Sequence, residues 1–314
     1  MPRLPNLIRA QQLTPPLIDE LCDHADFLRE KSRDKQLRRG FRWVGDGLYA
    51  FSLYTQPSTR TSLSHRTACA RWGITVQHTD FAKEASSFAK GETLEDTIHT
   101  LCELEPSLIV MRHDEEGTLE RAAKVAVQYS IPVINSGDGT NQHPTQALLD
   151  LYTIRRQLGK LSGLTVVCGG DCKRSRTVRS LAYLLAKYPG NKIVFVSTEA
   201  LRPDPSLLDY LTRHKTKWEL ETCLSAALEV GDAFYWTRNQ VEYGGDTAMT
   251  AYKITPNEMA KMKTSAILMH PLPRVDEITV ECDTDQRSVY FKAIKNGLWI
   301  RMALIGHLLG FKVR

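Results

Sequence analysis

The chain has 314 residues, of which 42% are hydrophobic, and its 41 basic and 36 acidic side chains leave a net charge of +5. This length accommodates two domains of about 150 residues, each with a sizeable core. Because charges of both signs are spread along the sequence, the small positive excess favours local anion sites over a nucleic-acid surface, and no uncharged apolar run reaches the length of about 18 residues that a membrane span needs.

Short apolar runs rich in Val, Ile, Phe and Tyr alternate with helical patterns along the whole chain. In the first half the runs lie at residues 48–54, 74–78, 107–111 and 131–135. The same alternation resumes after residues 142–159, with apolar runs at 164–169, 192–197, 233–236 and 266–269. This alternation predicts parallel strands joined by helices. We therefore predict an α/β fold with two parallel-sheet domains joined by helices.

The predicted domain boundaries follow from this rhythm. The first domain covers residues 1–142 and the second covers residues 143–287, with a connecting helix that starts near His143. Residues 288–309 carry apolar side chains at broadly helical spacing. We expect the C-terminal segment 288–314 to pack back onto the first domain.

The cysteines and the N-terminal segment indicate the cellular compartment in which the protein is expected to work. The seven cysteines are odd in number, and only Cys168 and Cys172 lie close together, without the paired spacing of a zinc site. This usage is typical of free thiols in a reducing compartment. The first 13 residues lack the apolar core of a secretory signal. We therefore expect a cytoplasmic protein without a metal centre.

A Ser-Thr-Arg-Thr segment follows the first predicted strand and precedes a helical pattern. Its residues are Ser58, Thr59, Arg60 and Thr61. At a helix N-terminus, free backbone N–H groups and the positive end of the helix dipole favour a phosphate group. The hydroxyls add donors, and Arg60 adds a planar fork that matches phosphate oxygens. The alternative for this segment alone is an ordinary serine or threonine helix cap.

Two further cations are candidate anion ligands. Lys90 lies in the polar segment 86–93, which is predicted to be a surface loop, and beside Gly91 it would reach a bound anion. The alternative is a solvated loop lysine. Arg112 ends the run 108–111, and open α/β sheets collect ligands at the carboxyl ends of their strands. Its alternative role is an ion pair with a neighbour such as Asp114.

Two histidine-proline segments supply groups suited to a carbonyl and an amide. His143 precedes Pro144 at a predicted helix start, where the imidazole would donate to a carbonyl oxygen and Gln146 would accept from an NH2 group. The alternative is a capping or structural histidine. In the segment 270–274, prolines stiffen the backbone after a buried strand, so that rigid carbonyls at this turn would accept from an NH2 group or an amine. The alternative there is a stiff connection without a ligand.

Assembled in this order, the segments resemble the aspartate/ornithine carbamoyltransferase family over nearly the whole chain. The sequences STRT at 58–61, HPTQALLD at 143–150 and HPLPRVDEI at 270–278 carry the resemblance. It implies a first domain that binds carbamoyl phosphate and a second domain that binds an amino acid. The implied reaction transfers the carbamoyl group to the α-amine of L-aspartate, a step of pyrimidine biosynthesis, and needs no metal or organic cofactor.

The resemblance also implies a role for each site residue. On the donor side these are Ser58, Thr59, Arg60, Thr61 and Arg112 for the phosphate, Thr61, Arg112 and His143 for the carbonyl, and Gln146 with the backbone of Pro271 and Leu272 for the NH2 group. Ser86 and Lys90 would reach in from a neighbouring subunit, which implies a homotrimer with shared sites.

The implied acceptor is a dicarboxylate. Arg176 matches the family arginine on the α-carboxylate, and Arg238 and Gln240 match the ligands of the side-chain carboxylate, with Lys90 also on the aspartate side. Arginine suits both tasks because its planar fork meets a carboxylate in two parallel hydrogen bonds. Ornithine-type relatives typically carry Cys at the position of Pro271, which disfavours that branch of the family.

Several positions depart from the family pattern. Gln56 replaces a glutamate and Tyr243 an arginine, two residues that help to hold the domains closed, while Ala89 replaces a loop lysine and Ser175 a glycine. Three further departures in the helix after the donor segment are Ser62, His65 and Arg66.

The departures leave two alternatives open: carbamoyl transfer to a different amine, and a low-activity homologue with a scaffold role. Regulatory or pathway-enzyme partners are also open. An NAD-binding enzyme is the weakest alternative, because Gly169 and Gly170 follow a strand without the G-x-G-x-x-G spacing.

Overall fold

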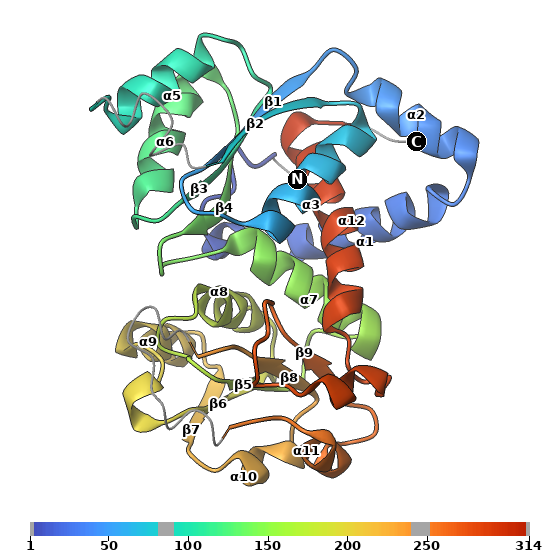
Figure 1. Cartoon of the computed structure of the whole chain (residues 1–314), viewed down its shortest axis with the longest axis vertical. Helices are drawn as coiled ribbons and strands as arrows, with labels where there is room; N and C mark the ends of the chain where they lie inside the picture. Colours follow the sequence, from blue (N-terminus) through green and yellow to red (C-terminus); the bar gives the residue numbers. More distant parts are fainter. Residues whose placement is uncertain (1–2, 81–90, 240–251, 312–314) are drawn as a thin grey trace. The chain divides into compact units, whose positions relative to one another are not determined.

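A computed structural model describes residues 3–80, 91–239 and 252–311. Ser86, Ala89, Lys90, Gln240 and Tyr243, which were singled out in the sequence, lie outside the described residues. The chain divides into two compact units (Figure 1): unit 1 is Met1–Thr145 with Lys295–Arg314, and unit 2 is Gln146–Ile294. Both boundaries fall inside helices.

Unit 1 contains a parallel sheet of four strands in the order β2-β1-β3-β4. The strands are β1 (Tyr49–Tyr54), β2 (Thr75–Asp80), β3 (Leu108–His113) and β4 (Val133–Asp138). Every residue of β3 and β4 is buried, as expected for strands covered on both faces. The helices are α1 (Pro15–Lys31), α2 (Lys35–Val44), α3 (Thr59–Trp72), α5 (Leu94–Cys102) and α6 (Thr118–Ala126), with 3₁₀ turns at Ala10–Gln12 and Val127–Tyr129.

The core of unit 1 lies between its sheet and the pair α5 and α6. Ile98 of α5 and Leu119 of α6 pack with Ile109 and Val133 of the sheet, and all four side chains are fully buried. Figure 1 shows the two helices side by side along this face of the sheet. This apolar layer fixes the strands, and therefore also fixes the positions of the residues that follow their carboxyl ends.

Unit 2 contains a parallel sheet of five strands in the order β7-β6-β5-β8-β9. The strands are β5 (Thr165–Gly169), β6 (Lys192–Val196), β7 (Lys217–Glu221), β8 (Ala233–Trp236) and β9 (Ile267–Met269). The helices are α8 (Arg176–Leu185), α9 (Pro205–Arg213), α10 (Leu224–Leu228) and α11 (Pro256–Lys261), with 3₁₀ turns at Glu199–Leu201 and Val280–Thr284. Leu228 and Met259 of α10 and α11 pack on Val167, Phe234 and other buried residues of the sheet.

Two helices contain the boundaries between the units. α7 (Pro144–Leu158) begins in unit 1 and continues in unit 2, and α12 (Tyr290–Leu309) begins in unit 2 and ends in unit 1. Within unit 1, Trp72 Nε1 donates to the Met302 carbonyl (2.9 Å) and Arg301 Nη1 donates to Ser64 Oγ (2.8 Å). The predicted return of the C-terminal helix to the first domain is therefore confirmed from Lys295 onward.

The predicted class of two parallel α/β domains is confirmed. Each apolar run identified in the sequence lies within or overlaps a strand, but β7 was missed. Its sequence, Lys-Trp-Glu-Leu-Glu, is only partly buried, because β7 is an edge strand of its sheet. A strand with one neighbour and a solvated face needs no continuous apolar run, so this signal was absent.

Each sheet has one topological switch point, which is the pair of neighbouring strands on either side of which the chain adds its later strands in opposite directions. In unit 1 this place is between β1 and β3, where Tyr54 pairs with Arg112. In unit 2 it is between β5 and β8, where Gly169 pairs with Trp236. Open α/β sheets bind ligands beyond the carboxyl ends of the strands at such switch points. Each unit therefore has one place where a ligand site is favoured.

Among the described residues, no helix combines the length and the apolar character required to cross a bilayer.

Candidate functional site

The donor segment lies directly beyond β1 at the switch point of unit 1. Ser58 is the N-cap residue of α3, yet its side chain makes no capping hydrogen bond. Thr59 and Arg60 are exposed in the first turn, and Thr61 is buried. The hydroxyl of Ser58 therefore does not satisfy the first N–H groups of the helix, which argues against the ordinary-cap alternative. A 14-residue helix that begins in this way offers N–H donors and its positive dipole end to an anion.

Arg112 donates to two neutral oxygen atoms near the donor segment. Its side chain is 8% exposed at the end of β3, where Nη2 donates to Gln56 Oε1 (2.6 Å) and Nη1 donates to the Ser136 carbonyl (3.3 Å). The Arg112 carbonyl accepts from Thr55 N–H (3.1 Å). Because Gln56 is neutral, this contact orients the guanidinium without neutralising its charge. A glutamate at position 56 would reduce the positive potential that Arg112 offers to a phosphate.

Asp114, the alternative partner suggested for Arg112, has contacts of its own. Its carboxylate accepts from Thr55 Oγ1 (2.9 Å) and lies 3.4 Å from His113 Nδ1. These contacts fix the loop that follows β3.

His143 is held at the start of α7, as the proline spacing predicted. Its side chain is 4% exposed, and Nδ1 lies 3.4 Å from Thr145 Oγ1. If the threonine hydroxyl donates to Nδ1, the ring proton is on Nε2, which is the tautomer needed to donate to a carbonyl oxygen. The preceding loop is fixed by Gln142, whose carbonyl accepts from Asp138 N–H (3.1 Å) and whose Oε1 accepts from Ala10 N–H (2.8 Å).

The segment after β9 forms a locked turn rather than a helix. His270 Nδ1 accepts from the Leu272 N–H (2.7 Å), and His270 Nε2 lies 2.7 Å from Glu277 Oε1. Leu272 has φ of 59°, in the left-handed region that few residues other than glycine adopt. Burial would raise the pKa of Glu277, but its interaction with His270 outweighs burial and lowers the pKa. Such a turn holds the carbonyls of Pro271 and Leu272 in one fixed direction.

The acceptor residues follow the two central strands of unit 2. Arg176 is the first residue of α8, and Ser175 caps this helix by accepting from the Val178 N–H (3.3 Å). The serine that replaces a family glycine therefore has a structural role. Arg238 follows β8, and the preceding Thr237 is tied to Gly169 by its N–H (2.8 Å) and its hydroxyl (3.2 Å). Both arginines are half-buried and lie beyond the carboxyl ends of β5 and β8.

Gly169 and Gly170 allow β5 and β8 to approach closely at this point. A Cβ atom on Gly169 would lie 2.0 Å from the Trp236 ring, and one on Gly170 would lie 2.0 Å from the Thr237 carbonyl. Gly170 also has φ of +101°. The pair is therefore explained by packing between two strand ends, without a dinucleotide.

The structure thus divides the predicted residues between two switch points. In unit 1, the donor segment and Arg112 follow neighbouring strands, and His143 follows the loop after β4. In unit 2, Arg176 and Arg238 follow β5 and β8. Within the described ranges, no three His, Cys, Asp or Glu side chains gather as a metal site would require.

Comparison with known proteins gives matches that together cover nearly the whole chain. Residues 5–156 match the model of the aspartate/ornithine carbamoyltransferase carbamoyl-P binding domain, and residues 162–308 match that of the Asp/Orn binding domain. The chain belongs to the aspartate/ornithine carbamoyltransferase family. Aspartate carbamoyltransferase 3, chloroplastic, of Pisum sativum is 43% identical over 98% of this chain and 78% of its own length.

Two solved structures are similar over nearly their full lengths. The catalytic subunit of M. Jannaschii aspartate transcarbamoylase has a TM-score of 0.88 and 35% identity, covering 98% of both chains. Aspartate transcarbamoylase from Trypanosoma cruzi in complex with carbamoyl phosphate and aspartate has a TM-score of 0.85 and 32% identity, covering 95% of both chains.

Sequence reasoning missed two contacts of this family member's site. The contact between Arg112 and Gln56 joins residues that are 56 positions apart, so no local pattern revealed it. The contact between Gln146 and Asp150 joins residues one helical turn apart. The spacing of four within HPTQALLD was a signal that would have predicted this second contact.

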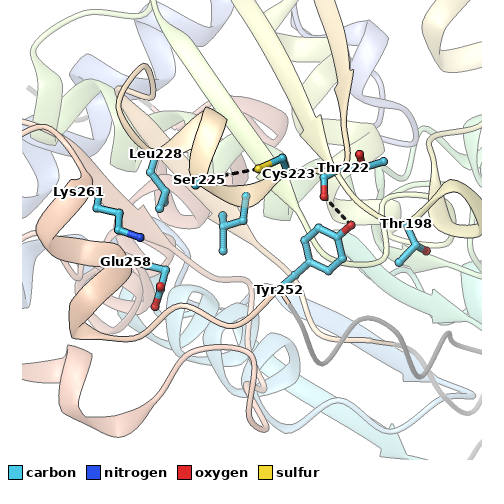
Figure 2. Close-up of a pocket in the computed structure, with 9 residues that line it drawn as sticks. Thr198, Thr222, Cys223, Ser225, Leu228, Tyr252, Glu258 and Lys261 are labelled. Atoms are coloured by element: carbon cyan, nitrogen blue, oxygen red, sulfur yellow. Dashed lines mark hydrogen bonds between the residues drawn. The ribbon is translucent and has the colours of Figure 1, made fainter.

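A separate pocket of about 500 Å³ lies in unit 2 (Figure 2). None of the described residues assigned from the sequence lines it. Its lining residues are Thr198, Thr222, Cys223, Leu224, Ser225, Leu228, Tyr252, Glu258 and Lys261. In Figure 2, the Tyr252 hydroxyl donates to the Thr222 carbonyl (2.8 Å) and Cys223 Sγ lies 3.0 Å from Ser225 Oγ.

Cys223 is expected to be the fastest-reacting thiol of the chain. It is exposed, and hydrogen bonds from the Ser225 side chain and from the Ala226 and Ser225 N–H groups lower its pKa. The other cysteines are buried, and burial raises the pKa of Cys69 and of Cys168 to about 12. Brief iodoacetamide treatment at pH 7 followed by peptide mass spectrometry should label this position first, and Cys223→Ser should remove the fast phase. Equal labelling of several cysteines in the folded chain would contradict this expectation.

His65 is expected to make unit 1 sensitive to acid. Its side chain is 1% exposed in α3, Nδ1 donates to the Thr61 carbonyl (3.0 Å), and Nε2 is buried without a hydrogen-bond partner. Burial, and then the charge of Arg301, lower the pKa of His65 well below its ordinary value. Because the unfolded chain binds this proton below about pH 6.5 and the folded chain does not, stability falls as the pH drops through that range.

The variant His65→Phe should remove this dependence, since a phenyl ring keeps the packing and has no proton to bind. We expect its free energy of unfolding, measured by urea titration, to fall less than that of the wild type between pH 7.5 and pH 5.5, by up to about 1.4 kcal/mol per pH unit. Parallel pH profiles for the two chains would show that the acid sensitivity arises elsewhere.

Proposed function

We propose that the chain transfers the carbamoyl group of carbamoyl phosphate to the α-amine of L-aspartate, giving N-carbamoyl-L-aspartate and phosphate. Membership of the family over the full chain supports this proposal, as does the likeness to an aspartate transcarbamoylase that was solved with both substrates. The product would enter pyrimidine biosynthesis. The observation that carries the proposal is the placement of arginines with fixed neighbours at both switch points.

The donor side is suited to a phosphate attached to a carbonyl. The N-terminus of α3 and Arg60 bind the phosphate oxygens, and Arg112, which donates to Gln56 Oε1, adds a further positive charge. His143, with its ring oriented through Nδ1, donates from Nε2 to the carbonyl oxygen. These donors favour the oxygen that gains negative charge when the carbonyl carbon is attacked.

The acceptor side is suited to a dicarboxylic amino acid. Arg176 binds the α-carboxylate and Arg238 binds the side-chain carboxylate. With both ends held, the neutral α-amine attacks the carbonyl carbon. The tetrahedral intermediate collapses as the bond to phosphate breaks, and the departing phosphate takes the proton that the amine loses. Positioning and charge stabilisation supply the catalysis, because phosphate is already a good leaving group.

The direct test is a colorimetric assay for carbamoyl-aspartate made from carbamoyl phosphate and aspartate. Parallel reactions with other amino acids and with diamines test the alternative of a different acceptor. Product with aspartate alone supports the proposal. Product with another amine alone, or no turnover by the purified chain, contradicts it, and the second result favours a scaffold role.

We further propose that the active form is a homotrimer in which Ser86 and Lys90 complete the site of a neighbouring subunit. The family resemblance supports this assembly. Light scattering tests the mass, and mixing inactive Lys90→Ala chains with inactive Arg60→Ala chains tests the sharing. Shared sites predict that hybrid assemblies recover activity, whereas self-contained sites predict no recovery.

We also propose that the protein works in the cytoplasm, which its free cysteines support. The relative from Pisum sativum is named chloroplastic, so imaging of the tagged full-length protein has to distinguish cytoplasm from plastid. Plastid fluorescence would contradict the proposal.

A further inference from the structure

Gln146 and Asp150 lie one turn apart on the same face of α7. Gln146 Nε2 is 3.1 Å from Asp150 Oδ1 and 3.2 Å from Asp150 Oδ2, so it is nearly equidistant from the two carboxylate oxygens. Gln146 is half-buried, and Asp150 is 1% exposed. A glutamine in the first turn of the helix is therefore tied to a buried carboxylate in the second turn.

This contact determines which end of the glutamine amide faces away from Asp150. A carboxylate only accepts hydrogen bonds, so the NH2 group of Gln146 has to face Asp150. The carbonyl Oε1 consequently points to the other side of the amide. The Gln146 amide has both donors and an acceptor, but its contact with Asp150 leaves only the acceptor, Oε1, on the side that faces away from Asp150.

Asp150 is itself fixed by a residue of the sheet. Tyr235, a fully buried residue of β8, donates through its hydroxyl to Asp150 Oδ2 (2.8 Å). Burial, and then the charge of Asp150, raise the pKa of Tyr235 well above its ordinary value, so the phenol keeps its proton and remains a donor. At the start of α8, Thr177 Oγ1 lies 3.0 Å from Ser175 Oγ.

The chain of contacts therefore runs within unit 2 from Gln146 through Asp150 to Tyr235 of β8. The orientation of the Gln146 amide depends on its own contact with the carboxylate, because a flipped amide would bring Oε1 against the two acceptor oxygens of Asp150.

We propose that Asp150 is a positioning residue that fixes the Gln146 amide, so that Oε1 accepts from the NH2 group of the donor and the site selects a carbamoyl group over an acetyl group. The inference rests on the proposed function, in which Gln146 contacts the carbamoyl NH2. Asp150 does not touch the substrate. A methyl group in place of NH2 would leave the fixed Oε1 without a donor, and a site built around such a hydrogen bond rejects the analogue that lacks it.

The test uses Asp150→Asn in the full chain. Because Gln146 Nε2 is nearly equidistant from both carboxylate oxygens, either orientation of the asparagine amide places an NH2 group next to the NH2 of Gln146. The Gln146 amide is then free to flip, and its NH2 group would face the donor NH2. Tyr235→Phe is the matched control, because it removes another contact of Asp150 and leaves both oxygens to Gln146.

The measurement is calorimetric binding of two stable probes, phosphonoacetamide and phosphonoacetone, which differ in having NH2 or CH3 on the carbonyl carbon. We expect the wild type and Tyr235→Phe to prefer the amide about 10- to 100-fold, and Asp150→Asn to lose most of this preference while keeping its affinity for phosphonoacetone. Thermal unfolding of each variant checks that the chain is folded.

An unchanged preference in Asp150→Asn would overturn the inference, and so would an equal loss of affinity for both probes, which would indicate only structural damage. Binding of the probes does not depend on an acceptor. A wild type that binds both probes with the expected preference but makes no carbamoyl-aspartate would therefore overturn the proposed function and leave the positioning role of Asp150 supported.

Discussion

Arg60→Ala is expected to lower kcat/KM for carbamoyl phosphate by about 10²-fold or more. Arg60 is exposed in the first turn of α3, so its guanidinium can reach a phosphate at that end of the helix. The N-cap side chain makes no capping bond, so the first N–H groups of the helix can bind the same phosphate. Each charge-assisted hydrogen bond is worth about 1.5–3 kcal/mol, and a bidentate contact provides two of them. Steady-state kinetics with carbamoyl phosphate as the varied substrate at saturating aspartate measures the loss.

Arg66→Ala provides the matched control for Arg60→Ala. Arg66 is an exposed arginine of the same helix, but it lies beyond the first turn, where the helix no longer offers free N–H groups. We expect its kinetics to stay within about twofold of the wild type. Similar losses in the two variants would mean that general positive charge, rather than the helix N-terminus, attracts the donor.

The strands could be predicted from local patterns where they are covered on both faces. Residues 108–111 could be predicted as a strand because a central parallel strand, covered on both faces, has a nearly continuous apolar run. The edge strand Lys217–Glu221 obeys no such requirement and was missed. Once the strands were placed, the positions of Arg60 and Arg112 followed from the rule that ligands bind beyond the carboxyl ends of parallel strands.

The contacts that orient the site residues could not be predicted in the same way. Tyr235 donates to Asp150 across 85 sequence positions, and this contact exists only because β8 packs near α7. Similarly, the role of Ser175 as a helix cap became visible only when α8 was seen to begin at Arg176. Patterns along the chain identify which residue types lie near a site, whereas the partners that fix their orientation depend on the tertiary fold.

Arg238→Ala is expected to raise the KM for aspartate by about 10²- to 10³-fold, with little change in the KM for carbamoyl phosphate. Arg238 follows β8 at the switch point of unit 2, and the preceding Thr237 is anchored to Gly169 by two hydrogen bonds. The side chain is half-buried, so its bond to a carboxylate is only partly screened by water. Loss of a bidentate pair costs about 3–4 kcal/mol, which gives the expected range.

Two further variants test the geometry behind the Arg238 prediction. Arg238→Lys keeps the charge without the planar fork, so it should recover only part of the lost affinity for aspartate. Arg213→Ala removes an exposed arginine at the end of α9, away from the switch point, and should leave the KM unchanged.

The role of Arg238 is separated from general damage by acceptors that lack the side-chain carboxylate. L-Asparagine has an amide in place of that carboxylate, so the wild type should use it poorly, and Arg238→Ala should use it no worse than the wild type does. A variant that loses aspartate and asparagine turnover in equal proportion would show that Arg238 supports the fold of the acceptor loop. Loss confined to aspartate would instead identify the carboxylate as the group that Arg238 binds. Replacing aspartate by asparagine already removes that contact, so removing Arg238 as well would cost nothing further.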